Sequence, residues 1–221
     1  MSSPSGPPPG SSATPPDVIV VGSGAAALSA ALAAAVGGAS VLILEKSEKV
    51  GGTSAMSGGG TWIPVNHHAR AAGLADSAEE ALSYLRAASA PGWAEREEPL
   101  WRSFVAHAPE MLEFVERHTP LRFALVEEPD PQAELPGGKV RGRMLSPRPL
   151  SRRLIGAYAG KLRRSTLPHR FTYQEMVGAD PYASPLRAAF RFWPRLLSRI
   201  ITDSAGQGNA LMVGLLRGVL D

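Results

Sequence analysis

Asp17 to Gly60 reads DVIVVGSGAAALSAALAAAVGGASVLILEKSEKVGGTSAMSGGG, and this stretch decides the fold. Its first apolar run, Val18 to Val21, is too short for a helix and is typical of a strand buried on both faces of a parallel sheet. A Gly-Ser-Gly turn follows, and the small and helix-favouring residues of 25–36 predict a helix. A second apolar run, Val41 to Leu44, is closed by Glu45. The order strand, glycine turn, helix, strand and acid predicts one βαβ unit.

The spacing within this unit is typical of dinucleotide binding. Gly22 allows the tight turn, Gly24 lets the backbone approach a pyrophosphate, and Ala27 is small enough to replace the third glycine of GxGxxG. The helix N-terminus offers free N–H groups and a positive dipole end to the phosphates. Glu45 is placed to accept hydrogen bonds from a ribose hydroxyl. An NAD-dependent Rossmann dehydrogenase would share all of these features.

The segment that follows, KSEKVGGTSAMSGGG at 46–60, resembles the FAD-binding segment of the fumarate reductase and 3-ketosteroid Δ1-dehydrogenase flavoprotein superfamily. In that family the segment lies along the pyrophosphate and under the flavin. An NAD-dependent Rossmann dehydrogenase would not account for the presence of this segment. Covalent flavin attachment in the family uses a histidine just before the threonine, where this chain has Gly52. The resemblance therefore implies FAD held without a covalent bond. The predicted cofactor-binding residues are Gly22, Ser23, Gly24, Ala25, Ala26, Glu45, Lys46, Gly52, Thr53, Ser54, Ser57, Gly58 and Gly59.

The resemblance also implies a fold class and a division of the chain into parts. We expect an α/β fold, with a Rossmann-like FAD-binding βαβ unit and an inserted, mainly helical α+β cap region, incomplete at the C-terminus. The expected parts are a disordered Pro/Ser/Gly tail at 1–16, the FAD-binding segment at 17–72, the cap at 73–200 and a helix returning to the FAD domain at 201–221. Its 221 residues are few for this superfamily, so a C-terminal half is expected to be missing. The alternative from another class is a truncated, non-catalytic nucleotide-binding fragment.

Helical periodicity dominates the middle of the chain. A helix is predicted at 76–90, where Ser77 and Glu80 have the spacing of a capping box. Further helices are predicted at 97–107 and at 109–118, separated because Pro109 should break the helix. A strand is predicted at Leu121 to Val126, and a last helix at 205–220 is expected to expose an apolar face where a neighbouring strand is missing.

Five residues after the signature have side chains that could contribute to a site. Trp62 fits the wall of a cofactor pocket and the core equally well. His67 and His68 are adjacent, so we expect their side chains to point in different directions and predict no metal site. His107 and Glu110 are left without a role.

A second resemblance to the ketosteroid dehydrogenase group lies at Glu134 to Gly138, ELPGG, and at the pair Gly142-Arg143. The steroid enzymes have an aromatic residue just ahead of that stretch, and this chain has Pro131, Gln132 and Ala133 there. This difference argues against a steroid substrate and leaves the wider family standing.

Charge is distributed unevenly although the net charge is only +3. Residues 139–170 contain ten Lys or Arg and no acid, which predicts a solvated or covered face, with anionic lipid or an acidic partner as the alternative. Arginines recur at 187, 191, 195 and 199 beside aromatic residues, and Pro194 argues against a straight helix there. This stripe predicts a solvated cap helix, with peripheral membrane contact as the alternative. No nucleic-acid motif accompanies the charge.

The activity that the resemblance implies is that of an FAD-dependent oxidoreductase. It transfers hydride between flavin and a carbon next to a carbonyl or carboxylate, and so makes or reduces a C=C bond. The substrate would be a small molecule, a steroid or other lipid-like ketone or a dicarboxylate. The catalytic acid and base are expected in the missing half, so no catalytic residue is named. The chain has no cysteine and shows no signal-peptide pattern or membrane span, so a cytoplasmic location is expected.

Overall fold

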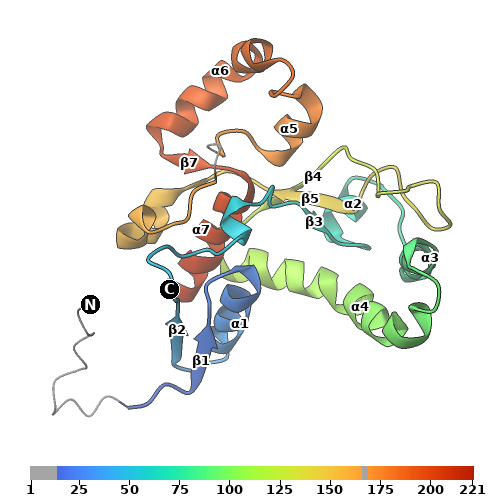
Figure 1. Cartoon of the computed structure of the whole chain (residues 1–221), viewed down its shortest axis with the longest axis horizontal. Coiled ribbons are helices and arrows are strands. Elements are labelled where there is room, and N and C mark those ends of the chain that lie inside the picture. The colour runs from blue at the N-terminus through green and yellow to red at the C-terminus, as the bar shows by residue number, and fades with distance from the viewer. Residues whose placement is uncertain (1–13, 166–168) are drawn as a thin grey trace.

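The βαβ unit forms as predicted in the computed structural model, which describes residues 14–165 and 169–221 (Figure 1). Strand β1 (Val18–Val21) pairs in parallel with β2 (Val41–Leu44), and helix α1 (Ala25–Val36) connects them. Asp17 Oδ2 accepts hydrogen bonds from the amide and hydroxyl of Ser40 at 2.8 and 2.6 Å, which joins the two strand entrances. Most of the tail expected at 1–16 lies outside the described residues.

The prediction that these strands are buried on both faces is wrong. Ile19 is 57% exposed and Val21 80%, and Leu42 and Leu44 on the neighbouring strand are also exposed. Alternate side chains of a strand point to opposite faces, and within the described residues α1 covers one face of this two-stranded sheet while the other face has no covering layer.

Helix α7 (Gln207–Leu220) is the centre of the core. It packs against α1 and against the short 3-10 helix η1 (Ser54–Met56), and most of its residues are buried. Leu28 and Leu32 of α1 belong to the same apolar cluster as Met212 and Leu215 of α7. The expectation that this helix exposes an apolar face is therefore wrong over most of its length, because α1 and η1 occupy that face.

A mixed region of short strands and helices lies on the other side of α7 (Figure 1). Its antiparallel sheet has the order β3-β5-β4, and β6 pairs with β7 in a second small sheet. Ser77 caps the N-terminus of α3 by accepting a hydrogen bond from the Glu80 amide at 3.2 Å, but the capping box is only half formed, because the Ser77 amide donates to Asp76 Oδ1. The elements are β3 (Thr61–Trp62), α2 (His67–Ala71), α3 (Ala78–Ala88), β4 (Phe123–Leu125), β5 (Met144–Pro147), β6 (Leu150–Ser151), the 3-10 helix η2 (Arg152–Gly160) and β7 (Ser204–Ala205).

The two helices predicted on either side of Pro109 are one helix, α4 (Ala94–His118). A proline inside a helix costs about 3 kcal/mol, because it removes one hydrogen bond and crowds the preceding turn. Burial of a large aliphatic side chain contributes about 1.5–3 kcal/mol, and α4 buries Val105, Leu112 and Val115 along one face. The burial therefore outweighs the proline, and the break is absent.

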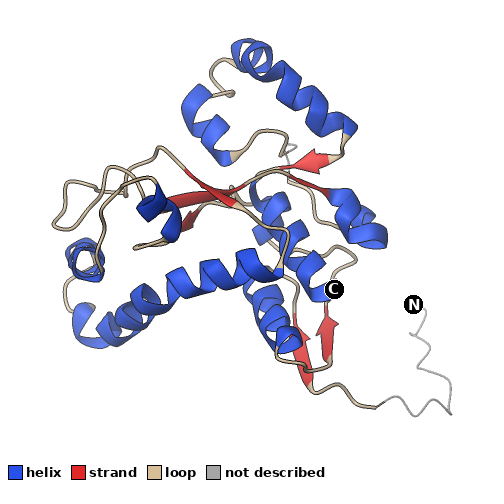
Figure 2. Ribbon diagram, turned by 180° about the vertical axis from the view of Figure 1, so that it is seen from behind, coloured by secondary structure: helices blue, strands red, loops and turns tan. Residues whose placement is uncertain are grey.

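The described residues before β7 end in an outlying pair of helices, α5 (Tyr173–Ala179) and α6 (Pro185–Ile201), seen from behind in Figure 2. Helix α6 also continues through a proline, Pro194. Its arginine stripe is not wholly solvated, since the Arg199 side chain is only 11% exposed and its Nη1 donates to Glu175 Oε2 at 2.6 Å. No helix in the described part of the chain has the length and apolarity needed to cross a bilayer.

Candidate cofactor site

The glycine turn between β1 and α1 is tied together by one buried hydroxyl. Gly22 has φ +98°, a backbone conformation that favours glycine, and its amide donates to the Leu44 carbonyl at 2.7 Å. Ser23 Oγ donates to Glu45 Oε2 at 2.5 Å and accepts from the Gly51 amide at 2.9 Å. Ser23, predicted as a direct cofactor contact, thus has its hydroxyl engaged within the protein, and it joins the turn, the acid and the glycine-rich segment.

Glu45 is held in place as a carboxylate. Hydrogen bonds from the Ser23 hydroxyl and from the Ser47 amide hold the pKa of Glu45 below its ordinary value. Each carboxylate oxygen has two lone pairs, so Glu45 keeps acceptor capacity for ribose hydroxyls after both internal bonds are made. Its position at the carboxyl end of β2, next to the turn, is the one a dinucleotide site needs.

The glycine-rich segment packs directly on the turn. Ser54 Oγ accepts a hydrogen bond from the Ala25 amide at 3.1 Å, so this hydroxyl satisfies the first amide of α1. Gly52 has φ +52°, and a Cβ added there would lie 3.5 Å from Gly24 Cα. Within the described ranges the amides of Ala26 and Ala27 have no acceptor, so the N-terminus of α1 keeps donors for an anion.

The N-terminus of α7 supports this segment from the far end of the chain. Asn209 Nδ2 donates to the Ala55 carbonyl at 2.6 Å and to the Arg163 carbonyl at 3.2 Å. A Cβ added to Gly59 would collide with the backbone of Gln207, so glycine is required for this close approach. The sequence reasoning missed Asn209, although a buried amide at the start of an apolar helix is itself a signal of a fixed polar partner.

The segment after η2 forms one wall of the site and was also missed. The Val50 amide donates to the Lys161 carbonyl and the Arg163 amide donates to the Val50 carbonyl, both at 2.9 Å. Beside this bridge lies a cavity of about 520 Å³ that reaches Ser23, Glu45 and the apolar residues of β2 and α7. The basic stretch at 139–170 therefore includes residues, among them Lys161, that line the same cavity as Glu45.

A second cavity, of about 460 Å³, lies on the other side of the glycine-rich segment. Its lining is mainly apolar and aromatic and comprises Met56, Gly58, Ser165, His169, Phe171, Met176, Pro181, Tyr182 and Gln207. Burial lowers the pKa of His169, so its imidazole is neutral near pH 7. A cavity of this size, with apolar side chains and a small number of polar groups such as His169 and Gln207, suits a small molecule with an apolar body and a polar substituent.

Three predicted cofactor residues are exposed beside these cavities. Lys46, Thr53 and Ser57 are exposed, and Ser57 Oγ donates to the Ser54 carbonyl at 2.8 Å. Trp62 lies elsewhere: its Nε1 donates to Asp130 Oδ1 at 2.7 Å and its ring stacks on Phe104. Of the two roles given to Trp62, the structure therefore supports the core, because the ring packs against α3 and α4.

The Gly142-Arg143 pair is also structural. Arg143 is fully buried, and it contacts Asp76 at 2.7 and 3.0 Å and Asp130 at 2.8 Å. Its guanidinium also lies 5.3 Å from the centre of the Trp62 ring. The ELPGG turn packs against α3, where a Cβ on Gly137 would collide with the Glu80 carbonyl.

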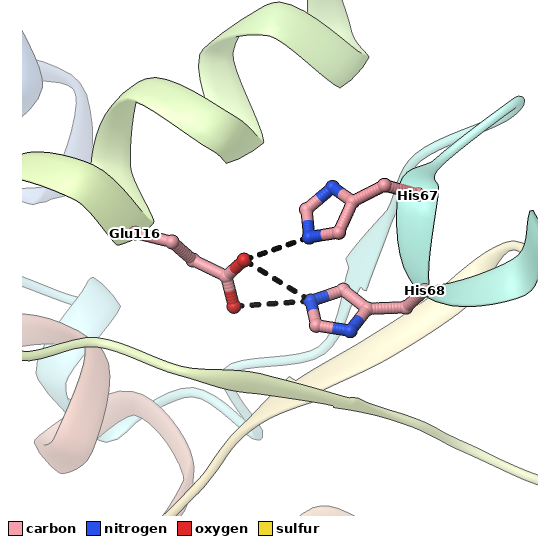
Figure 3. Close-up of side chains that lie close together, drawn as sticks. All are labelled: His67, His68 and Glu116. Carbon is pink, nitrogen blue, oxygen red and sulfur yellow. Dashed lines mark hydrogen bonds and ion pairs between the residues drawn. The ribbon is translucent and has the colours of Figure 1, made fainter. Parts of the chain in front are cut away.

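The two adjacent histidines do not diverge as predicted. Both Nε2 atoms contact the carboxylate of Glu116 on α4, from His67 at 2.9 Å and from His68 at 3.0 Å (Figure 3). The expectation of divergent side chains assumed an extended loop. The residues instead open helix α2, where neighbouring side chains are only about 100° apart.

The residues at the turn fit FAD. Backbone without side chains at Gly24 and Gly52, open amides at the start of α1 and an ionised Glu45 together provide for a pyrophosphate and a ribose. The cofactor site would therefore be held by the turn, the acid and the glycine-rich segment, with Asn209 behind them.

Comparisons with known proteins agree with this geometry. A family model described as FAD binding domain matches residues 17–221. A 4-oxocyclohexanecarboxylate 2-dehydrogenase of Sinomonas cyclohexanicum is 37% identical over 179 residues, which cover 80% of this chain and 29% of that protein. A 3-oxosteroid 1-dehydrogenase of Mycobacterium tuberculosis is 43% identical over 114 residues, which cover 51% of this chain and 20% of that protein.

The same likeness appears among solved structures. The crystal structure of 3-ketosteroid Δ1-dehydrogenase from Sterolibacterium denitrificans in complex with 1,4-androstadiene-3,17-dione has a TM-score of 0.75 and 34% identity. The match covers 93% of this chain and 38% of that one. The chain thus spans less than a third of the two curated relatives above.

Proposed function

Because this chain belongs to the FAD binding domain family, we propose that it holds FAD non-covalently between the glycine turn and the segment at 52–59. The observation that carries the proposal is the packing of that segment on the turn, through Ser54 to the Ala25 amide and through Ser23 to the Gly51 amide. An NAD site needs the glycine turn and the acid, but it does not require the segment at 52–59 that packs on the turn. Gly52 offers no side chain for a covalent bond to flavin.

Bound FAD would supply the hydride acceptor, and the protein would supply position and polarity. The open amides of α1 would bind the pyrophosphate, and Glu45 would accept hydrogen bonds from the ribose. Gly58 borders the second cavity, and Gly59 lets the N-terminus of α7 pack closely against the segment beside that cavity. Asn209 holds the Ala55 carbonyl and so keeps the segment at its distance from the turn.

We infer a dehydrogenase acting on a CH–CH bond next to the carbonyl of an alicyclic ketone. The names of the two curated relatives each specify an oxo group on a ring system. The mainly apolar cavity at Gly58 and Phe171 suits the ring of such a substrate better than it suits a dicarboxylate, because within the described residues its lining includes no Lys or Arg. Between a monocyclic ketone and a steroid we favour the monocyclic ketone, since Pro131, Gln132 and Ala133 replace the aromatic residue.

The test of cofactor binding is a visible spectrum of the chain after incubation with FAD and desalting, followed by acid precipitation. We expect a flavin spectrum that stays with the protein and is released by acid. Ser54→Ala should weaken retention about tenfold because the Ala25 amide loses its acceptor, whereas Ser89→Ala, a matched change at the exposed end of α3, should not. A colourless protein, or NAD⁺ retained in place of FAD, would refute the proposal.

The test of substrate class uses the FAD-loaded protein without oxygen. A 4-oxocyclohexanecarboxylate should bleach the flavin absorbance, a 3-oxosteroid should bleach it more slowly, and succinate should leave it unchanged. Faster bleaching by succinate than by either ketone would contradict the substrate class while leaving FAD binding intact.

Helix α6 suggests a peripheral membrane contact for the same protein. Leu186, Phe190 and Trp193 are 85%, 82% and 58% exposed on one face, and Arg187 and Arg191 follow beside them. A helix with an apolar aromatic face flanked by arginines is typical of binding in the plane of an anionic bilayer. Sedimentation with phosphatidylglycerol vesicles should therefore exceed that with phosphatidylcholine, and Phe190→Glu should abolish it. Equal sedimentation of the wild-type and Phe190→Glu chains would contradict this contact.

A further inference from the structure

The cluster of His67, His68 and Glu116 joins two elements that are distant in the sequence. Helix α2 follows the cofactor segment and its connecting strand β3, and Glu116 lies in the last turns of α4 (Figure 3). One ligand atom from each of the three residues lies within 4.8 Å of the others. None of the three belongs to the cofactor site, and they are the only such group of His and acidic residues in the described part of the chain.

The distances are close to those of a tetrahedral metal centre. Bonds of about 2.0–2.1 Å place two tetrahedral ligand atoms about 3.3 Å apart. The Nε2 atom of His67 lies 2.9 Å from Glu116 Oε2, and that of His68 lies 3.0 and 3.2 Å from the two carboxylate oxygens. Each imidazole nitrogen would therefore have to move away from the carboxylate oxygen by only a few tenths of an ångström to admit an ion, and all three ligand atoms already lie within 4.8 Å of one another.

The imidazoles are oriented by the surrounding backbone. Asn66 caps α2 by accepting from the Ala69 amide at 2.8 Å, and its Nδ2 donates to the Ile63 and Gly142 carbonyls. Val65, two residues before His67, has φ +55°, which a β-branched residue rarely adopts. This backbone is fixed by Asp76, whose Oδ2 accepts from the Val65 amide at 2.9 Å. The histidine pair therefore sits on a well-defined support.

The other nitrogen of His67 faces a second carboxylate. His67 Nδ1 is buried without a hydrogen-bond partner, and Glu113 Oε1 lies 3.9 Å from it. Metal-bound imidazoles commonly donate their other N–H to a carboxylate, which fixes the ring and strengthens the ligand. Glu113 is 51% exposed on the turn of α4 before Glu116, so its side chain is free to close that distance.

The charge around the cluster favours a cation. In the described residues Glu116 has no Lys or Arg partner for its carboxylate, because Arg122 contacts only the Glu116 carbonyl. The His67 and His68 side chains are 31% and 25% exposed, so water can complete the coordination. Two imidazoles and one carboxylate are a ligand set that zinc uses with water in the fourth position.

We propose that His67, His68 and Glu116 bind one Zn²⁺ ion, with water as the fourth ligand and Glu113 supporting His67. Glu116 Oε1 also accepts from the Phe123 amide at 2.7 Å, so the ion would link α2, α4 and the start of β4. Such a link would clamp the cap onto the strand that leaves the cofactor segment. The site has a structural role in this proposal and takes no part in the flavin chemistry.

The test is calorimetric titration of the tag-free, metal-stripped 221-residue chain with ZnCl₂ at pH 7.5. We expect one ion per chain and a rise in melting temperature of at least about 5 °C at a hundredfold excess over Kd. His67→Asn and His68→Asn should each weaken binding at least about tenfold. His107→Asn is the matched control, because His107 forms an exposed pair with Glu110 at 3.0 Å and has no third ligand among the described residues. Binding that survives His68→Asn, or falls equally in His107→Asn, would overturn the proposal.

A spectroscopic measurement on the unmodified chain covers the case in which a histidine variant fails to fold. X-ray absorption at the zinc edge should show two imidazoles and oxygen ligands at four-coordinate zinc. A centre with one imidazole or none would refute the site. Neither measurement requires FAD, so failure of this proposal is separable from failure of the cofactor proposal.

Discussion

Replacing Arg143 by methionine should destabilise the protein more than any other single arginine substitution in the described part of residues 73–200. The guanidinium is fully buried between Asp76 and Asp130, whose side chains are 7% and 2% exposed. Removing one partner of a buried ion pair costs about 3–5 kcal/mol because the remaining charge is left without compensation. Domains of ordinary size have a free energy of unfolding of about 5–15 kcal/mol, so the loss is a large share of the total.

Urea unfolding followed by tryptophan fluorescence and by circular dichroism measures this effect. At an m-value of about 2 kcal/mol/M, the loss corresponds to a fall of about 1.5–2.5 M in the midpoint. The control is Arg86→Met, because Arg86 also contacts a carboxylate, Glu98, through two nitrogens at 2.8 and 2.5 Å, but its side chain is 40% exposed. Water replaces an exposed partner, so Arg86→Met should lower the midpoint only slightly.

A rescue variant separates stranded charge from lost packing. Adding Asp76→Asn and Asp130→Asn to Arg143→Met removes both uncompensated carboxylates, so the midpoint should recover by about half. Equal losses for the Arg143 and Arg86 variants, or no recovery in the triple variant, would refute the reasoning.

Three further outcomes follow from contacts described above. Gly214→Ala should lower the free energy of unfolding by about 1–3 kcal/mol, measured by calorimetry, because a Cβ there would overlap the buried Leu121 side chain. Gly178→Ala is the control and should be neutral or stabilising, because no described atom lies within 4 Å of a Cβ there. Equal effects of the two substitutions would contradict this reasoning. Burial raises the pKa of Glu175, but hydrogen bonds from Arg199 and the neighbouring backbone outweigh it and leave the pKa lowered. The stability that the Glu175–Arg199 pair contributes is therefore present at neutral pH and is lost as the pH falls through the lowered pKa. In the Glu175→Gln variant, the urea midpoint should therefore change less with pH between about pH 6 and 3 than in the wild type. Asn209→Leu should weaken FAD retention about tenfold, and an unchanged titration would show that the Ala55 carbonyl needs no support.

The βαβ unit was predictable because its signals are local. Apolar runs, glycines and an acid occur in order within the stretch from Asp17 to Glu45, and no distant residue is needed to form them. The helices around Pro109 and Pro194 were not predictable in the same way. A proline's local cost is visible in the sequence, but the apolar face that offsets it depends on which elements pack against that face.

In the candidate site, too, the local features were predictable and the contacts between distant residues were not. The segment from Gly52 to Gly59 can be identified as a motif in the sequence, and its role in holding FAD stays a prediction. The domain boundaries at 72 and 200 also stay predictions. The contacts of Asn209 and the convergence of His67 and His68 on Glu116 join residues far apart in the chain. Single-sequence reasoning treats each residue with its neighbours and so misses such pairs.

The position of α7 has a consequence for synthesis on the ribosome. Ala55 and Asn209, which share a hydrogen bond, are 154 residues apart. At roughly 5–20 residues per second, the glycine-rich segment waits roughly 8–30 s before its partner is made. During that interval the chain has α1 but lacks α7, the helix that packs against Leu28 and Leu32, so these two side chains have no cover from it. At the proposed site, FAD would therefore bind only after the α7 segment has left the exit tunnel.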